Sequence, residues 1–337
     1  ASHEGVLIKG SNYLETLSKT KVVVFDKTGT LTEGHPTVIG WLWAQGQEEH
    51  YKDVLLAAES TSDHPLAEAI VTALEGEEQV IPAHLDGFEN ITGKGVRVAY
   101  QGAEYWVGSH KLLKDYQANL SDILADMLTQ YESDGNSIVY FGRENDLLAV
   151  IAIKDQLRVT SMEAIRELRI QDIEICMLTG DGERTASSVA GSLGIMRFVA
   201  DAMPDDKEDF IHKLQLQGKT VAMVGDGVND AQALSCADVS IAMGKGTDTL
   251  MDTAMITLRT SDLLLLPKVF RLSRQTVSLM YRNLFWAFIY NTVGIFVAAG
   301  VLYPVYDILL SPALAGAAMA LSCVSVALSS LRLSSRF

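Results

Sequence analysis

Three apolar runs of the sequence end at side chains that could do phosphoryl chemistry. The run KVVVF ends at Asp26, the run IEICML ends before Thr179 and Asp181, and the run TVAMV ends shortly before Asp226. A carboxylate held near Mg²⁺ and the N–H groups of glycine-rich loops can attack a phosphoryl group and form an aspartyl-phosphate. These positions make Asp26 the candidate nucleophile.

The other groups that phosphoryl transfer needs can also be named. A divalent ion requires a second acid, for which Asp226 is the candidate. The transferring oxygens require a cation, for which Lys207 in MPDDKEDF is the candidate. The Thr179 hydroxyl can donate to the phosphate, and Asn229 and Asp230 can orient Lys207 or a Mg²⁺-bound water.

Repeated strand, loop and helix units must position these groups. Each of the three apolar runs is expected to be a strand followed by a helical stretch, which predicts an α/β fold with a parallel sheet and helices on both faces. Ligands of such sheets bind beyond the carboxyl ends of the strands. We therefore expect the three loops to meet at one site.

Residues 36–149 interrupt this pattern. The segments GVRVAYQGAEYWVGS and SIVYFGRENDLLAVIAI alternate and turn like antiparallel hairpins, while residues 50–74 and 118–133 have helical spacing. This predicts an inserted α+β domain, after which the parallel sheet resumes near Lys154.

Composition divides the chain into an acidic part and an apolar, basic part. Of the formal net charge of −15, residues 263–337 contribute +5 and residues 1–262 contribute −20. Such an acidic part disfavours nucleic acid as a partner, because phosphate backbones are bound by basic patches. Two uncharged windows, 284–302 and 308–331, are each long enough to cross a bilayer. Arginines precede the first window and follow the second, so the positive-inside rule predicts a hairpin with both ends in the cytoplasm.

Three motifs carry a family resemblance. The segments DKTGTLTEG from Asp26, MLTGD at 177–181 and MVGDGVNDAQAL at 223–234 resemble those of the P-type cation-transporting ATPases, in the same order. The resemblance implies a haloacid-dehalogenase-like parallel sheet (the phosphorylation domain), an inserted nucleotide-binding domain and a C-terminal transmembrane helical hairpin. The implied divisions are 1–35 (stalk and first part of the phosphorylation domain), 36–149 (nucleotide-binding domain), 150–266 (rest of the phosphorylation domain) and 267–337 (stalk and two transmembrane helices). It also implies catalytic roles for Asp26, Lys207, Thr179 and Asp181, and a Mg²⁺ site at Asp26, Thr28, Asp226 and Asp230.

Further motifs resemble the heavy-metal branch of this family. ESTSDHPLAEAI is similar to its His-Pro signature, with Glu59 and His64, and GFENITGKGV supplies Gly93 and Gly95. The resemblance implies that these residues, with Gly108, bind the adenine end of ATP. His64 also suits a simpler role as a surface helix cap. Ser109 follows Gly108, where the family often has asparagine.

The transported ion is suggested by the two apolar windows. AFIYNTVG contains Tyr290 and Asn291, and AAMALSCVSV contains Met319, Ser322 and Cys323, similar to signatures of the copper(I) subgroup. Thioether and thiolate ligands select Cu(I), and by the same chemistry Ag(I). The windows hold no carboxylate or lysine, which a zinc or cadmium pump would be expected to have. Cys323 replaces the serine of the signature, and Phe296 stands where proline is common.

These resemblances favour the C-terminal portion of a copper(I)-exporting ATPase. They imply a multi-pass protein of the cell (inner) membrane with cytoplasmic catalytic domains, a lipid bilayer around its helices and a copper chaperone as donor. The Cys-Pro-Cys and Thr-Gly-Glu motifs of such pumps do not occur in these 337 residues, so we expect the chain to be part of a longer pump.

Three alternatives stay open. The first is a pump for zinc, cadmium or silver, and the second is a non-catalytic nucleotide-binding partner of another chain. The third is a membrane-anchored phosphatase of the haloacid dehalogenase type. Such phosphatases usually have an aspartate two residues after the nucleophile, where this chain has Thr28.

Overall fold

The computed structural model describes residues 5–44, 48–62, 64–77, 80–118, 122–226, 230–244 and 254–299, together with Gly316 and Val324. The chain forms two compact units. One contains residues 1–9 and 20–267, and the other contains residues 10–19 and 268–337. All three strand-end motifs lie in the first unit.

A seven-stranded sheet carries the ends of the three predicted strands. Its strand order is β1-β13-β12-β11-β2-β9-β10, and only the edge pair β1–β13 is antiparallel within the described sheet. The predicted parallel sheet is therefore confirmed. The strands are β1 (Val6–Ile8), β2 (Val22–Asp26), β9 (Glu174–Leu178), β10 (Arg197–Val199), β11 (Val221–Gly225), β12 (Val239–Met243) and β13 (Ile256–Leu258).

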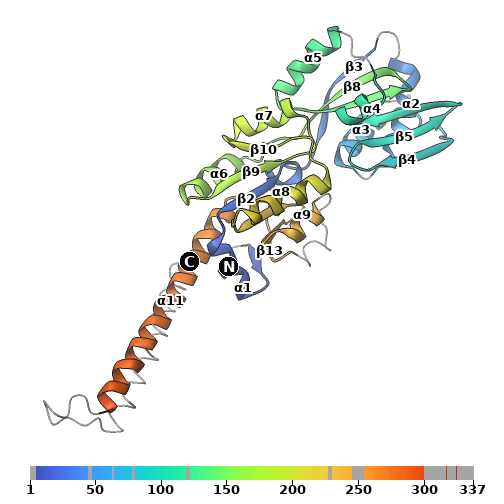
Figure 1. Cartoon of the computed structure of the whole chain (residues 1–337). Helices are drawn as coiled ribbons and strands as arrows, with labels where there is room; N and C mark the ends of the chain where they lie inside the picture. Colours follow the sequence, from blue (N-terminus) through green and yellow to red (C-terminus); the bar gives the residue numbers. More distant parts are fainter. Residues whose placement is uncertain are drawn as a thin grey trace. The chain divides into compact units, whose positions relative to one another are not determined.

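Helices cover both faces of this sheet, as predicted. Helices α6 (Ser161–Ile170) and α7 (Glu183–Ser192) lie on one face, and α8 (Pro204–Leu216) and α9 (Ala231–Cys236) lie on the other (Figure 1). The strand order explains this arrangement, because the chain steps from β2 toward β10 and then returns to β11. Connections between parallel strands are almost always right-handed, so reversing the direction of travel puts the helices on the other face.

The segment after β2 differs from the prediction. A helical stretch was expected there, but only one π-helical turn, Lys27–Leu31, follows before the chain leaves for the inserted domain. The turn is broken internally, because Thr28 has extended backbone angles and Gly29 has φ of +72°. The prediction of a helix was wrong because the insertion begins where a parallel unit would place its crossover helix.

The inserted domain is a six-stranded antiparallel sheet with strand order β3-β8-β7-β6-β5-β4. Both predicted hairpins are confirmed, as β5–β6 and β7–β8. Strand β8 pairs with β3 as far as Lys154, so the predicted boundary at 149/150 falls inside a strand. The strands are β3 (Thr37–Trp43), β4 (Gly87–Ile91), β5 (Gly95–Tyr100), β6 (Ala103–Gly108), β7 (Ser137–Arg143) and β8 (Asp146–Lys154).

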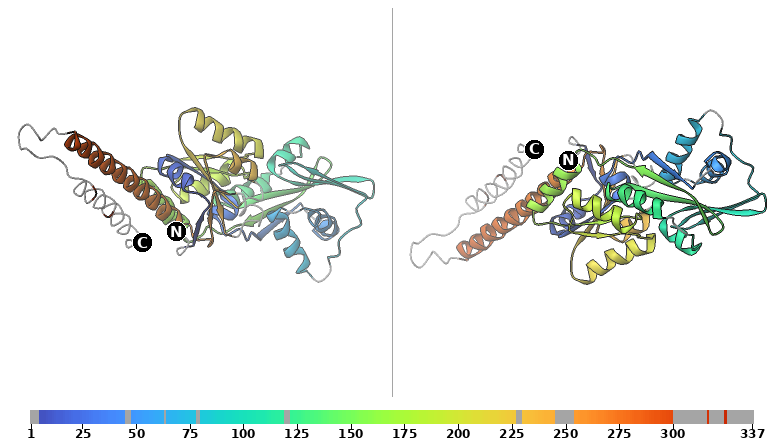
Figure 2. Two further views of the ribbon diagram at one scale, coloured as in Figure 1. Left: turned by 90° about the horizontal axis from the view of Figure 1, so that it is seen from below. Right: turned by 90° about the horizontal axis from the view of Figure 1, so that it is seen from above.

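Two helix pairs cover opposite faces of the six-stranded sheet (Figure 2). Helices α2 (Glu48–Glu59) and α3 (Pro65–Glu75) share a core with Val98, Phe141 and Ile151. Helices α4 (His110–Asp115) and α5 (Asp122–Ser133) share a second core with Trp106 and Val150. Neighbouring residues such as Val150 and Ile151 enter opposite cores, because strand side chains alternate between the two faces.

The second unit contains α1 (Ser11–Lys19) and all but the first turn of α11 (Leu265–Ala298). The Ser273 hydroxyl on α11 donates to the Leu14 carbonyl on α1. No helix within the described residues is both long enough and apolar enough to cross a membrane. The predicted window 308–331 lies outside the described residues apart from Gly316 and Val324.

Candidate active site

Asp26, Lys207 and Asp230 form a contiguous charged group at the carboxyl end of the parallel strands. The Lys207 ammonium group donates to Asp26 Oδ1 at 2.7 Å and to Asp230 Oδ1 at 2.5 Å. Asp26 is the last residue of β2, Lys207 lies in the first turns of α8, and Asp230 directly precedes α9. Three segments far apart in the sequence therefore meet at the proposed nucleophile.

Because this group is buried, its charges act strongly on one another. Burial alone would lower the pKa of Lys207, but the Asp26 and Asp230 carboxylates hold it above its usual value. Burial, reinforced by the negative charge of Asp26, raises the pKa of Asp230 to about 7, and Lys207 opposes this shift. The other Asp230 oxygen, Oδ2, is buried without a hydrogen-bond partner among the described residues. The site thus keeps a permanent cation beside the nucleophile.

Asp226 lies against the turn that follows the nucleophile. A Cβ added to Gly29 would come within 2.2 Å of Asp226 Oδ2, and the φ of +72° at Gly29 also disfavours any other residue. Strand β11 pairs with β2 in parallel, with Val224 opposite Phe25, so both carboxylate-bearing strand ends reach the same edge. The glycine allows the Asp226 carboxylate to pack directly on the backbone of the catalytic turn.

Lys27 and Asp181 form a second buried ion pair at the same edge. The Lys27 ammonium group contacts Asp181 Oδ2 and donates to Ser137 Oγ at 2.9 Å. Thr179 Oγ1 donates to the same carboxylate at 2.8 Å. Burial would raise the pKa of Asp181, but Lys27 and these hydrogen bonds hold it below its usual value. The motif residues Thr179 and Asp181 are therefore brought to the site together.

The sequence did not point to Lys27, nor to Asp155 and Arg158, which hold the catalytic turn in place. Thr32 Oγ1 donates to Asp155 Oδ2 at 2.5 Å, and Arg158 donates from its guanidinium group to the carbonyl oxygens of Gly29 at 2.7 Å and Thr30 at 2.9 Å. The available signal was position, because Asp155 directly follows β8 and Arg158 comes three residues later, where the chain returns to the parallel sheet. Charged residues at such a return point have long-range partners that spacing does not reveal.

The acidic residues present fit a magnesium ion. Mg²⁺ prefers hard carboxylate oxygens and usually keeps several waters, so one or two side chains suffice. Asp26 and Asp226 supply such oxygens at one edge of the sheet, and the unpartnered Asp230 Oδ2 is the kind of atom that a bound water could satisfy. Thr28 is partly exposed within the same turn. Asp230 itself contacts Lys207, which fits the predicted orienting role, whereas Asn229 lies outside the described residues.

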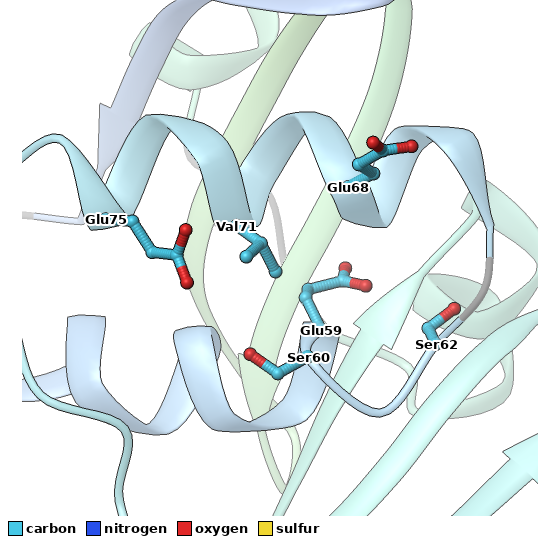
Figure 3. A pocket seen from close by; sticks show the side chains of 6 residues that line it. All are labelled: Glu59, Ser60, Ser62, Glu68, Val71 and Glu75. Atoms are coloured by element: carbon cyan, nitrogen blue, oxygen red, sulfur yellow. The ribbon is translucent and has the colours of Figure 1, made fainter.

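Glu59 lies at the end of α2 beside a pocket of about 460 Å³. Glu59 is only 6% exposed, and burial raises the pKa of its carboxyl group to about 8. The carboxyl group is therefore mostly protonated at neutral pH. Figure 3 shows the side chains that line the pocket, which are Glu59, Ser60 and Ser62 at the end of α2 and beyond it, and Glu68, Val71 and Glu75 on α3.

His64 caps helix α3. Its Nδ1 accepts a hydrogen bond from the Leu66 backbone N–H at 3.2 Å, and Pro65 occupies the first helical position. The helix-cap role is thus confirmed. Although the residue is exposed overall, desolvation of the ring lowers the pKa of His64, and the negative charge of Asp181 opposes this shift. The nucleotide role of His64 stays a prediction.

Neighbouring protein atoms lie very close to the three glycines predicted to bind nucleotide, so a side chain would not fit at these positions. Gly95 and Gly108 are paired across β5 and β6, and a Cβ at either would come within 2.1 Å of a carbonyl oxygen. Gly93 has φ of +67°, and a Cβ there would come within 2.6 Å of the Met203 sulfur. Of the five predicted nucleotide residues, only Glu59 lines the pocket shown in Figure 3.

The predicted copper ligands are only partly covered by the described residues. Tyr290 and Asn291 are neighbours on α11, and both are exposed. Met319, Ser322 and Cys323 lie outside the described residues. The Cu(I) site as a whole therefore stays a prediction.

Comparison with known proteins decides the family of the catalytic domain. A family model described as haloacid dehalogenase-like hydrolase matches residues 20–238, which is more than half of the chain. The chain belongs to this family. The match includes strands β2, β9, β10 and β11 and the residues Asp26, Lys207 and Asp226.

Two curated relatives extend the similarity over nearly the whole chain. The chain is 42% identical to a copper-exporting P-type ATPase of Legionella pneumophila, with 98% of this chain and 45% of the relative covered. It is 44% identical to a silver exporting P-type ATPase of Salmonella typhimurium, with 98% and 40% covered. The resemblance to heavy-metal P-type ATPases is thus confirmed, although the chain spans less than half the length of these relatives.

Two solved structures share the fold. A zinc-transporting PIB-type ATPase superposes with a TM-score of 0.66 at 34% identity, and the match covers 99% of this chain and 53% of that one. The catalytic domain of a CPx-ATPase, described for its conformational changes upon nucleotide binding, also has a TM-score of 0.66, at 29% identity. That match covers 80% of this chain and 96% of the domain. The likeness therefore includes the arrangement of the sheets.

Proposed function

We propose that this chain is the catalytic and C-terminal membrane portion of an ATP-driven Cu(I) exporter that forms an aspartyl-phosphate at Asp26. The observation that carries the proposal is the pair of contacts from Lys207 to Asp26 and Asp230 beside the Asp226 carboxylate. A carboxylate nucleophile, a fixed cation and a second acid are the parts that phosphoryl transfer from ATP requires.

In the proposed reaction an Asp26 carboxylate oxygen attacks the γ-phosphorus of ATP. A bond forms between that oxygen and phosphorus, and the bond from phosphorus to the bridging oxygen breaks, so that ADP leaves. Lys207 offsets the negative charge on the transferring oxygens. Asp26 and Asp226, with Thr28 beside them, would hold Mg²⁺, which supplies Lewis-acid stabilisation of the phosphate charge. The Thr179 hydroxyl, fixed on Asp181 by its hydrogen bond, would donate to the phosphoryl group.

A lasting phosphoenzyme distinguishes a pump from a phosphatase. Thr28 stands two residues after the nucleophile, where a phosphatase of this family usually has a general acid and base. A threonine hydroxyl cannot take a proton from water at neutral pH, so hydrolysis would be slow. The phosphoenzyme would then persist through a conformational change.

The inserted domain is proposed to bind the nucleotide. The protonated Glu59 carboxyl group would hydrogen-bond the adenine base, and His64 would contact it from the start of α3. Gly93, Gly95 and Gly108 would let the backbone approach the nucleotide, because glycine has no side chain that would keep a ligand away.

Cu(I) is proposed as the transported ion, with Tyr290, Asn291, Met319, Ser322 and Cys323 as its site in a pair of transmembrane helices. The names of the copper- and silver-exporting relatives support a soft monovalent ion, as sulfur ligands do. The likeness to a zinc-transporting ATPase keeps Zn²⁺ as the second candidate. We further propose a cell (inner) membrane location with the catalytic domains in the cytoplasm, and a copper chaperone as donor.

The test of the catalytic proposal is phosphorylation of the assembled protein by [γ-³²P]ATP and Mg²⁺. Wild type should give an acid-stable label that hydroxylamine removes, because only an acyl-phosphate has that lability. Asp26→Asn should give none. Asp172→Asn is the matched control, because Asp172 is exposed with φ of +58°, a conformation that asparagine also adopts. Full labelling of the Asp26→Asn variant would refute the assignment.

Metal selectivity needs a separate measurement. ATPase activity of the same assembled protein should rise with Cu(I) and fall in Met319→Ala and Cys323→Ala variants, while phosphorylation from inorganic phosphate survives. Stronger stimulation of the wild-type ATPase activity by Zn²⁺ than by Cu(I) would make zinc the transported ion in place of copper. The assignment as an ATPase would stand.

A further inference from the structure

Helices α8 and α9 bring together three metal-binding side chains that the catalytic proposal does not use. Glu208, His212 and Cys236 each offer one ligand atom, and these atoms all lie within 4.8 Å of one another. Glu208 and Cys236 are half-buried and His212 is exposed, so an ion from solvent could reach them. Oxygen, nitrogen and sulfur donors are therefore gathered at one accessible point.

The helices hold this cluster in place. Glu208 and His212 are four residues apart on α8, so their side chains project from the same face. Cys236 is the last residue of α9. The apolar residues between the two helices are buried in one core, namely Ile211 and Leu214 on α8 and Ala233 and Leu234 on α9. The spacing of the ligands is thus set by helix packing and not by a loose surface loop.

Gln215 sets the orientation of the histidine. Its Nε2 donates to the Cys236 carbonyl oxygen at 2.9 Å, which fixes its Oε1 as the atom that faces His212 Nδ1 at 3.1 Å. Because Oε1 can only accept, Nδ1 must carry a hydrogen. In the neutral ring the lone pair then lies on Nε2, the nitrogen that faces Glu208 at 3.4 Å. This is the arrangement by which outer partners fix metal-binding histidines.

Two electron-pair donors consequently face each other. The Nε2 lone pair and the Glu208 carboxylate repel unless a proton or a metal cation lies between them, and the Cys236 thiol stands beside both. We propose that Glu208, His212 and Cys236 bind a divalent transition metal ion of borderline softness, for which Zn²⁺ is the best match. Zn²⁺ is commonly held by thiolate, imidazole and carboxylate together.

The required adjustment is small. Ligand atoms around a tetrahedral zinc ion stand about 3.3–3.8 Å apart, as bond lengths of about 2.0–2.3 Å imply. The Nε2 to Oε1 separation is already 3.4 Å, and the limit of 4.8 Å on the others leaves about 1 Å to close by side-chain rotation. Binding would convert the Cys236 thiol into a thiolate and release its proton to solvent. A fourth position would be left for water.

The site has a consequence for the catalytic group. Glu208 directly follows Lys207, and α9 begins directly after Asp230. A metal ion would therefore tie together the two helices that supply the lysine and the carboxylate contacting it. This inference does not depend on the transported ion or on phosphorylation.

The experiment uses the purified full chain with the Asp26→Asn substitution, so that no turnover contributes. Titration with Co²⁺ at pH 7.5 should produce a thiolate-to-metal charge-transfer band, and Zn²⁺ should remove that band by displacing Co²⁺. Cys236→Ser should abolish the band. Cys176→Ala, which removes a buried thiol on β9, should leave it unchanged.

Zn²⁺ affinity then tests the nitrogen ligand and its orientation. Competition with a chromophoric chelator should show at least a tenfold loss for His212→Gln and a loss of about 10–100-fold for Gln215→Ala, which acts through His212. His84→Gln, at an exposed histidine elsewhere, should change nothing. His212 and His84 are both exposed, so replacing either histidine by glutamine leaves the core intact and a fold defect would not mimic the result.

Two outcomes would overturn the site. One is a charge-transfer band that survives Cys236→Ser, which would place the binding thiol elsewhere. The other is Zn²⁺ affinity that is equal in wild type, His212→Gln and Cys236→Ser, or an absence of saturable binding in all three. Loss of phosphorylation in the assembled pump would leave this inference untouched, since the test protein is already inactive.

Discussion

Replacing the buried Glu59 by glutamine should remove a pH dependence of stability. Burial raises the pKa of this carboxyl group from 4.5 to about 8. Between these values the folded chain keeps a proton that the unfolded chain releases, so the free energy of unfolding falls as the pH rises. Each pH unit costs at most about 1.4 kcal/mol, so the window from 4.5 to 8 amounts to about 5 kcal/mol.

The assay is urea unfolding at pH 5, 6, 7 and 8 followed by tryptophan fluorescence. Three of the four tryptophans, Trp41, Trp43 and Trp106, lie on strands of the six-stranded sheet, so the signal reports mainly on the domain that contains Glu59. Glu59→Gln should match wild type near pH 5 and exceed its stability by several kcal/mol at pH 8, because the amide stays neutral throughout.

Glu68→Gln is the control for this measurement. Glu68 lines the same pocket but is exposed, so its substitution should keep the pH slope of wild type. The reasoning fails if Glu59→Gln has the same slope as wild type between pH 5 and 8. It also fails if the substitution lowers stability equally at every pH, since that result would mean a lost packing contact and not a buried charge.

Three other substitutions test the backbone and ion-pair arguments. Lys27→Met leaves the buried Asp181 carboxylate without its cation and should lower the free energy of unfolding by about 3–5 kcal/mol in urea titrations. Gly29→Ala would drive a methyl group into the Asp226 carboxylate and should reduce the rate of phosphorylation by ATP and Mg²⁺ more than it reduces ATP affinity. Gly95→Ala would collide with a carbonyl of the neighbouring strand, so calorimetry should show weaker ATP binding, whereas unchanged binding would argue against that glycine's role.

Local patterns were sufficient to predict the elements that carry the site. The apolar runs before Asp26, Thr179 and Asp226 are parallel strands whose carboxyl ends meet. The sequence predicted them because a short apolar run and the residues that end it are properties of a few adjacent positions. The two hairpins of the inserted domain were equally visible. The helix expected after Asp26 was wrong, because a local pattern does not show where an insertion begins.

The partners of the charged residues were decided by the tertiary structure. Asp26 and Lys207 are 181 residues apart, and Asp230 proved to contact the same ammonium group. Lys27, Asp155 and Arg158 entered the site only through contacts with distant segments. No spacing rule links such positions, because the distance between two side chains across parallel strands depends on how the sheet is ordered. These charges are buried or partly buried, and an unpaired charge inside the protein would lower the free energy of unfolding by several kcal/mol. Each of them therefore has a partner that only the folded chain supplies.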